Sequence, residues 1–151
     1  MHNFKENGEI QNKGDVEMMK EMKYTFERKI EILEHGTCFE LFYWIVSYGT
    51  HPCAYIMIPQ SNKYFKKDFE EIDIDVHGGL TYSNKYLPFE TKRSDNKAWY
   101  IGWDYAHYGD YMGYEEKVPK DFRNGGKKWT TEEIKREVRK VCYKIRRLGD
   151  E

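Results

Sequence analysis

Residues 39–58 constrain the fold of this chain more than any other part of it. Residues 39–48 are rich in aromatic and β-branched side chains, which favour strands. Residues 49–52 are Gly, Thr, His and Pro, and residues 53–58 form a second apolar run that ends before Pro59. Two such runs joined by a short turn predict an antiparallel hairpin.

Alternation of apolar and polar side chains extends this sheet. The period of two predicts further strands at 24–33, 72–76 and 98–104. Residues 34–37 are expected to form a turn between the first strand and the hairpin, because this polar segment ends in Gly and Thr. Residues 60–71 read as a polar connection with at most one helical turn. The pattern as a whole predicts an antiparallel sheet of about five strands.

The C-terminal region predicts one helix. Thr130 and Glu133 have the spacing of a capping box, in which each side chain bonds the other residue's backbone amide. We therefore expect a single α+β domain over residues 16–151, with the helix covering one face of the sheet, and a flexible N-terminal arm over residues 1–15. The apolar stripe of the helix consists of Ile134, Val138, Val141, Ile145 and Leu148.

Composition places the chain among folded proteins. Charged residues make up 34% of it and its mean hydropathy is -0.92, values that alone would fit a disordered chain. Aromatic residues, however, make up 17%, and disordered segments are poor in rings. The sequence therefore predicts a folded domain with a polar surface and an aromatic interior or binding surface.

Charge and cysteine content limit the partners and the compartment. The 25 basic and 26 acidic residues nearly cancel, whereas a duplex DNA or RNA binder needs a basic surface. Cys38, Cys53 and Cys142 have neither zinc-site nor disulfide spacing, so we expect small core residues in a reducing compartment. The sequence has no apolar run of roughly 18 residues and no secretory leader pattern, so we expect a cytoplasmic protein with no membrane partner.

Two short segments carry side chains suited to binding or catalysis. The first, residues 76–83, follows a predicted strand and places an imidazole, two glycines, two hydroxyls and a phenol together. Glycines expose backbone amides, and amides with hydroxyls form a cradle for an anion such as phosphate. The spacing matches neither a P-loop nor a dinucleotide-binding fingerprint, and a glycine bulge with a capping histidine explains the same residues. The candidate ligand-binding residues are His77, Gly78, Gly79, Thr81, Tyr82 and Ser83.

The second segment, residues 102–110, combines acids, an imidazole and rings. Asp104, His107 and Asp110 are spaced by three and three, and such a set binds a divalent metal or serves as acid and base. Ordinary turn formation explains the same Asp and Gly residues. The rings around them, Trp103 included, suit a planar ligand such as a nucleobase. Whether a metal or cofactor is bound stays open.

A third segment adds a wall to the same expected pocket. Residues 49–55 contain His51, which precedes Pro52 and is therefore kept out of helical backbone. A histidine in such a turn is more often structural than a ligand. We therefore assign residues 49–55 to the surroundings of the site.

The motifs resemble those of a family of small phage and prophage proteins. They read HPCAYI from His51, VHGGLTYS from Val76 and GWDYAHYGD from Gly102, and the resemblance extends over residues 24–148. The resemblance implies a phage origin and activity inside a host cell. Small phage proteins of this kind include inhibitors of bacterial immunity, some of which sequester nucleotide second messengers such as cyclic oligonucleotides or cyclic ADP-ribose derivatives.

Three functions follow from these residues. The favoured hypothesis is a non-catalytic protein that binds and sequesters a small nucleotide-like immune signal, as a homodimer that encloses the ligand. The alternatives are a metal-dependent hydrolase of a nucleotide or phosphoester, and a direct protein inhibitor of a host defence enzyme. The residues expected to bind the ligand are His77, Gly78, Gly79, Thr81, Tyr82, Ser83, Trp103, Asp104, His107 and Asp110.

Overall fold

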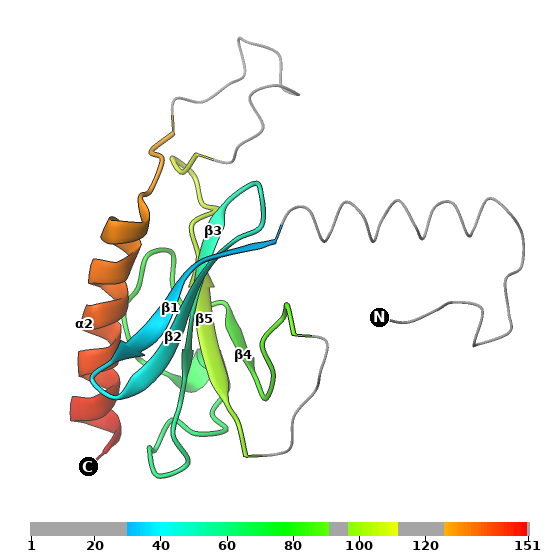
Figure 1. Cartoon of the computed structure of the whole chain (residues 1–151). Helices are drawn as coiled ribbons and strands as arrows, with labels where there is room; N and C mark the ends of the chain where they lie inside the picture. The colour runs from blue at the N-terminus through cyan, green and yellow to red at the C-terminus, as the bar shows by residue number, and fades with distance from the viewer. Residues whose placement is uncertain (1–29, 91–96, 112–125, 151) are drawn as a thin grey trace, which may run out of the picture.

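One antiparallel sheet and one long helix make up the described part of the chain (Figure 1). The computed structural model describes residues 30–90, 97–111 and 126–150. The helix lies against one face of the sheet, which confirms the predicted α+β class. The predicted arm at 1–15 and most of the first predicted strand lie outside the described residues. No helix in the described ranges is long and apolar enough to cross a membrane.

The sheet has five strands in the order β1-β2-β3-β5-β4, and every neighbouring pair is antiparallel. Strand β5 therefore lies between the hairpin and the short edge strand β4. The elements are β1 (Glu31–Cys38), β2 (Leu41–Ser47), β3 (Pro52–Met57), the short 3-10 helix η2 (Phe69–Glu71), β4 (Tyr82–Asn84), β5 (Tyr100–Asp104) and α2 (Thr131–Gly149).

The first hairpin turns later than predicted. Residues 34–37, expected to form the turn, belong to β1 and pair with β2. The turn is formed instead by Phe39 and Glu40, whose φ angles are 50° and 64°. Positive φ at both central residues is the geometry of a tight hairpin turn, for which Asn and Gly are the usual residues. Because Phe and Glu do not signal such a turn, the prediction of a turn at 34–37 was wrong.

One further member of the sheet, the edge strand β4, also differs from the prediction. Residues 72–76 form no strand, although Ile72 and Ile74 are buried. Their alternation reflects packing of an extended segment against the core, without pairing to a neighbouring strand. Strand β4, at residues 82–84, pairs with β5 and completes the sheet. The predicted number of five strands is therefore right, but the strand predicted at 72–76 is replaced by one at 82–84.

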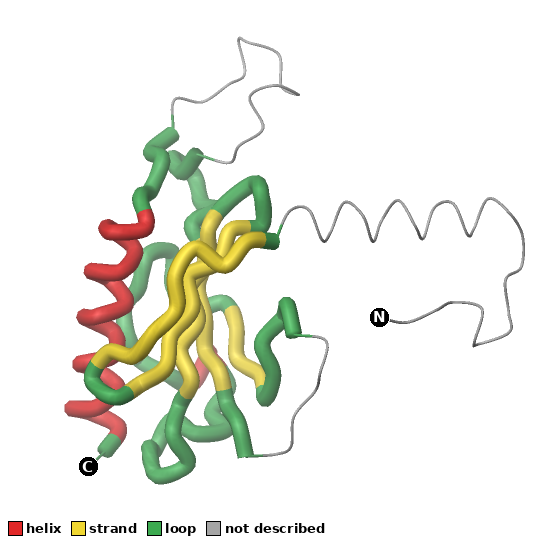
Figure 2. Tube along the Cα trace, viewed as in Figure 1, coloured by secondary structure: helices red, strands yellow, loops and turns green. Residues whose placement is uncertain are grey.

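Helix α2 begins and packs as predicted. The amide of Glu133 donates to Thr130 Oγ1 (3.2 Å) and the Thr130 amide donates to Glu133 Oε1 (3.0 Å), which completes the capping box. The helix covers the sheet face formed by β1, β2 and β3 (Figure 2). Leu148 is an exception to the predicted stripe because 36% of it is exposed. The buried residues of the helix are Ile134, Val138, Val141, Cys142, Ile145 and Gly149.

The opposite face of the sheet carries a second, smaller core. Its buried members include Val46, Tyr55 and Leu87. The three cysteines are buried without disulfides, as expected of small core residues. Burial raises the pKa of the Cys53 and Cys142 thiols to about 12, so both stay protonated.

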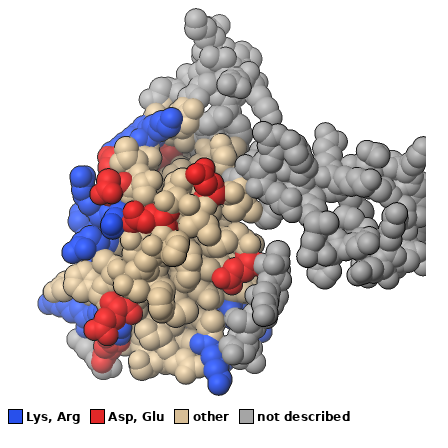
Figure 3. Space-filling model, in the orientation of Figure 1, with Lys and Arg blue, Asp and Glu red and all other residues tan. Residues whose placement is uncertain are grey.

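On the side shown in Figure 3, basic side chains line the edge formed by α2, and the centre of this surface carries few charges.

Candidate functional site

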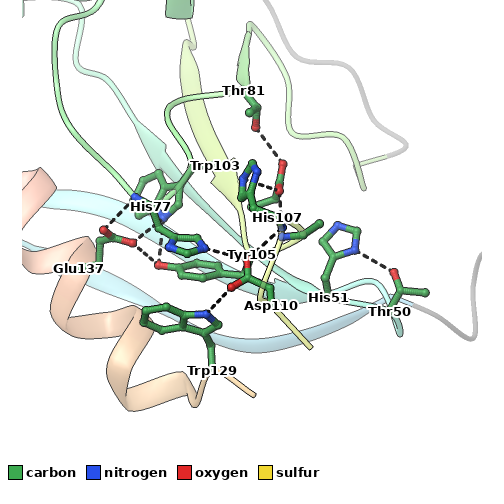
Figure 4. Close-up of polar contacts among 12 residues, drawn as sticks. Thr50, His51, His77, Thr81, Trp103, Tyr105, His107, Asp110, Trp129 and Glu137 are labelled. Carbon is green, nitrogen blue, oxygen red and sulfur yellow. Dashed lines mark hydrogen bonds and ion pairs between the residues drawn. The ribbon is translucent and has the colours of Figure 1, made fainter. Parts of the chain in front are cut away.

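Two turns meet at the end of strand β5 (Figure 4). In the first, the Gly79 amide donates to the Val76 carbonyl oxygen (2.9 Å), with Gly78 at φ 72°. In the second, the Asp110 amide donates to the His107 carbonyl oxygen (2.9 Å). Positive φ at Gly78 lets the first turn close without the strain that a Cβ would add. These turns bring the two predicted segments together.

The Asp110 carboxylate is the centre of this meeting. Its Oδ2 accepts hydrogen bonds from His77 Nε2 (2.7 Å) and the His107 amide (3.0 Å), and its Oδ1 accepts one from Trp129 Nε1 (2.8 Å). Only 3% of Asp110 is exposed. Burial acts to raise the pKa of this carboxyl, but the bonds from His107, His77 and Trp129 outweigh it and lower the pKa. An ionised carboxylate only accepts, so His77 carries its proton on Nε2.

Glu137 of α2 holds the other side of the first turn. Its Oε2 accepts from the His77 amide (3.0 Å), and its Oε1 accepts from the Tyr105 hydroxyl and from Trp103 Nε1 (3.2 Å). Trp103 and Tyr105 are almost completely buried. Burial, followed by the bond to Glu137, raises the pKa of the Tyr105 phenol. Trp103, which was predicted to bind ligand, therefore lies in the core and contacts the site through Glu137.

Ring contacts complete what we call the histidine–aromatic cluster, formed by His77, Tyr105, His107, Asp110 and Trp129. The imidazole of His77 stacks on the ring of Tyr105, with centroids 4.8 Å apart and planes 9° from parallel. The Trp129 ring lies 4.9 Å from His77 and 5.0 Å from Tyr105, tilted against both. The His107 ring meets His77 edge-on at 5.5 Å. The cluster is thus held by both hydrogen bonds and ring packing.

Asp104 and His107 form a second acid–imidazole pair. Asp104 Oδ2 accepts from the Thr81 hydroxyl (3.1 Å), and Asp104 Oδ1 accepts from the Ala106 amide (3.1 Å). Nε2 of His107 lies 3.1 Å from Asp104 Oδ1, close enough for an ion pair. This nitrogen is buried, and it makes no hydrogen bond within the part of the chain that the structure describes.

Gly78 is required by the position of His107. A Cβ on Gly78 would lie 2.0 Å from His107 Nε2, closer than any real contact. Gly79 has φ 85°, but a Cβ there would meet no atom within 4 Å. The double glycine therefore has two different roles: close approach of an imidazole at Gly78, and backbone conformation alone at Gly79.

Tyr82 and Ser83 do not join the other predicted residues. The Tyr82 hydroxyl donates to the Tyr86 carbonyl oxygen, and its ring packs 5.5 Å from Tyr55 in the second core. The Ser83 hydroxyl donates to Asp68 Oδ1 (2.8 Å) and accepts from the Phe69 amide (2.9 Å). Successive residues of a strand point to opposite faces, so β4 directs these two side chains apart and away from His77.

A pocket of about 340 Å³ lies beside the cluster, with Trp129 among its lining residues. It lies between the turn joining β2 to β3 and the residues that precede α2. His51 lines it, with Nδ1 2.8 Å from the Thr50 hydroxyl. Burial lowers the pKa of His51, while Asp104 acts to raise it and His107 to lower it. The lining residues are Leu33, Ser47, Gly49, Thr50, His51, Pro52, Tyr111, Lys128 and Trp129.

The segment that carries Trp129 is fixed against the second turn. The Lys127 amide donates to the Gly109 carbonyl oxygen (2.7 Å), and the Tyr111 amide donates to the Lys127 carbonyl oxygen (2.9 Å). The Lys127 ammonium lies 3.9 Å from the centroid of the Trp129 ring and 2.7 Å from Glu133 Oε2. Trp129 is therefore a fixed wall shared by the histidine–aromatic cluster and the pocket.

Sequence reasoning missed three residues of this site. Tyr105, Trp129 and Glu137 were not among the candidates. Glu137 did carry a signal, because it lies three residues after Ile134 and four before Val141, an acid on the apolar side of the helix. An acid in that position needs a buried partner. Trp129 immediately precedes the helix cap, and nothing in its local sequence connects it with Asp110.

The four candidate metal ligands are engaged with one another. His77 pairs with Asp110, and His107 lies beside Asp104. Across residues 30–90, 97–111 and 126–150, no group of three or more His, Cys, Asp or Glu side chains is arranged to hold a metal ion.

No match was found when the chain was compared with protein-family models, with curated proteins and with solved structures. The function of this site is therefore inferred from its own residues.

Proposed function

We propose that this chain binds a small, anionic, nucleotide-like molecule in the pocket beside the histidine–aromatic cluster. The observation that carries the proposal is the mixture of chemistries in the pocket walls. Trp129 supplies an indole, Lys128 an ammonium group, His51 an imidazole and Thr50 a hydroxyl. Rings with a few convergent polar groups are what a site for a planar, charged ligand requires.

The size of the pocket narrows the ligand. Ligand pockets range from about 300 to 1,000 Å³, so a volume of about 340 Å³ is at the lower end. A single nucleotide unit suits this volume better than a complete cyclic oligonucleotide does. A larger cyclic signal would need a second pocket, which the homodimer expected from the sequence would supply.

The cluster behind the pocket supports binding by fixing its wall. The Trp129 indole N–H is bonded to the buried Asp110 carboxylate, and its ring packs on His77 and Tyr105. A wall that is already ordered loses little conformational entropy when a ligand arrives, which favours affinity.

The resemblance to small phage proteins supplies the biological context of this proposal, which is infection of a host cell. In that setting the ligand is a nucleotide signal of host immunity, and tight binding without turnover removes it from the host cytoplasm. Sequestration requires only a pocket and a sufficient amount of protein.

Hydrolysis of the ligand is the second candidate. It is favoured by one observation, the 2.7 Å bond that holds the His77 imidazole on a buried carboxylate. Such a pair orients an imidazole as a general base. Recovery of the ligand after incubation distinguishes the two functions, because sequestration returns an intact molecule and hydrolysis returns products.

Calorimetric titration with a panel of mononucleotides, cyclic dinucleotides and cyclic ADP-ribose derivatives tests the proposal. The protein is then denatured and the released ligand is weighed by mass spectrometry. We expect one class of ligand to bind and to be released intact.

Trp129→Ala, with Trp99→Ala as its matched control, tests the location. Loss of an aromatic wall of the pocket removes apolar contact worth about 1–3 kcal/mol, or roughly 5- to 150-fold in Kd. We expect a loss in this range for Trp129→Ala and none for Trp99→Ala, whose indole bonds the Lys67 carbonyl oxygen elsewhere. Thermal melts of both variants identify any loss caused by unfolding. Absence of binding by every panel member, or equal effects of the two substitutions in folded proteins, would contradict the proposal.

A further inference from the structure

His51 lines the pocket and has one ring nitrogen without a bonded partner among the described residues. Its Nδ1 is bonded to the Thr50 hydroxyl at 2.8 Å, and among the described residues no group bonds its Nε2. The histidines of the cluster differ, since His77 Nε2 is taken by Asp110 and His107 Nε2 is buried against Gly78. Of these three imidazoles, His51 is the one that lines the pocket.

Lys128 is the accessible cation of the same pocket. Its neighbour Lys127 is engaged with Glu133 at 2.7 Å, whereas the described residues offer Lys128 no ion-pair partner. The Lys128 ammonium lies 5.2 Å from the centroid of the Tyr111 ring, which also lines the pocket. A cation and an imidazole with open hydrogen-bonding capacity provide two contacts for one anion.

The surroundings of His51 favour its neutral form while the pocket is empty. Burial lowers the pKa of His51, and the nearby His107 imidazole acts in the same direction. Asp104 acts in the opposite direction, but this carboxylate already accepts bonds from Thr81 and the Ala106 amide. The titratable and charged groups around His51 are Tyr48 after β2, Asp104 and His107 at and beyond the end of β5, and Tyr111 and Lys128 in the pocket lining.

We infer that the pocket is specific for a phosphate group, held by His51 and Lys128, and that His51 takes up a proton when the phosphate binds. This inference rests on the proposed function for the nucleotide part of the ligand. The proton comes from solvent. With both ring nitrogens protonated, Nδ1–H donates to the Thr50 hydroxyl oxygen and Nε2–H donates to a phosphate oxygen. Burial deprives the imidazolium of hydration, and the negative charge of the phosphate compensates for this loss.

Adenosine 3′,5′-cyclic monophosphate and adenosine form the test pair. The cyclic phosphate carries one charge and does not titrate between pH 6 and pH 8, so any proton taken up comes to the protein. Isothermal titration in buffers of different ionisation enthalpy measures that uptake. We expect the cyclic nucleotide to bind at least tenfold more tightly than adenosine, with uptake approaching one proton and tighter binding at pH 6 than at pH 8.

Variants assign the proton and the charge. His51→Gln retains a hydrogen-bonding side chain but cannot be protonated, so we expect weaker binding and no proton uptake. His35→Gln is the matched control on the exposed strand β1 and should retain both. Lys128→Met should weaken binding at least fivefold while proton uptake persists. Thermal melts show whether each variant is folded.

Each result either supports or overturns the inference. Equal affinities for the cyclic nucleotide and adenosine, proton uptake that persists in folded His51→Gln, or no binding of the cyclic nucleotide at millimolar concentration would overturn it. The first of these leaves the proposed function standing, because a nucleoside-like ligand still binds. Failure of every ligand in the wider panel overturns the proposed function as well.

Discussion

The histidine–aromatic cluster and the pocket beside it differ in how far their polar groups are satisfied. On the cluster side, Asp110 accepts three hydrogen bonds and Glu137 accepts three. On the pocket side, His51 Nε2 and the Lys128 ammonium have no hydrogen-bond or ion-pair partner among the described residues. The side with the more conspicuous motif is thus the side with less capacity left for a ligand.

This difference separates a framework from a binding surface. Buried polar groups that satisfy one another fix the positions of the elements that carry them. Groups with remaining hydrogen-bonding capacity at a pocket are available to a ligand. We therefore assign the histidine–aromatic cluster to positioning and the pocket to binding, and the predictions that follow test this division.

Removal of the central carboxylate has the largest expected effect. Asp110→Ala leaves the donors from His77, His107 and Trp129 without their acceptor. At about 1–3 kcal/mol for each unmet buried donor, we expect a loss of about 3 kcal/mol or more in the free energy of unfolding. Urea denaturation measures this loss. A variant as stable as the natural chain that no longer binds ligand would show instead that Asp110 acts on the ligand.

The two adjacent glycines provide a matched pair of intermediate effect. Gly79→Ala places a Cβ in open space and costs only the strain of positive φ, about 1–2 kcal/mol. Gly78→Ala adds overlap with the His107 ring, which we expect to cost about 1–3 kcal/mol more. Thermal or urea unfolding compares the two variants. Equal stabilities would mean that His107 does not pack on Gly78 as described.

Acid should weaken the framework through Asp110. Its pKa in the folded protein lies below the ordinary value near 4, so the unfolded chain binds the proton more readily. The stabilisation is therefore present above about pH 4 and is lost as pH falls through the lower, folded-state pKa. Urea unfolding between pH 2 and pH 7 should show a smaller acid-induced loss for Asp110→Asn than for the natural chain. Identical slopes for both proteins would contradict this role of Asp110.

Most of the fold is predictable from the sequence. The hairpin strands, strand β5 and the capped helix all follow from local patterns that the structure confirms. The predicted turn at 34–37 failed because Phe39 and Glu40 adopt a conformation that their side chains do not favour. The prediction of a strand at 72–76 failed for a different reason. Ile72 and Ile74 are buried between polar residues, and this alternation arises in an extended segment whether or not it pairs with a neighbouring strand.

The candidate site is predictable only in part. His77, Asp104, His107 and Asp110 do come together, because the two turns that hold them close on each other. Tyr82 and Ser83 separate because strand alternation directs them to other partners, and this depends on a short strand that the sequence did not reveal. Trp129 and Lys128 come from a distant segment, and only tertiary structure brings them beside His51.

Imidazole nitrogen chemical shifts test the division between framework and binding surface most directly. The ¹⁵N-labelled protein is titrated with adenosine 3′,5′-cyclic monophosphate at pH 7, and the ring nitrogens of each histidine are followed by NMR. We expect the signals of His51 to move toward those of an imidazolium, while those of His77 stay unchanged. Movement of the His77 signals with His51 unchanged would contradict the division and place the ligand at the histidine–aromatic cluster.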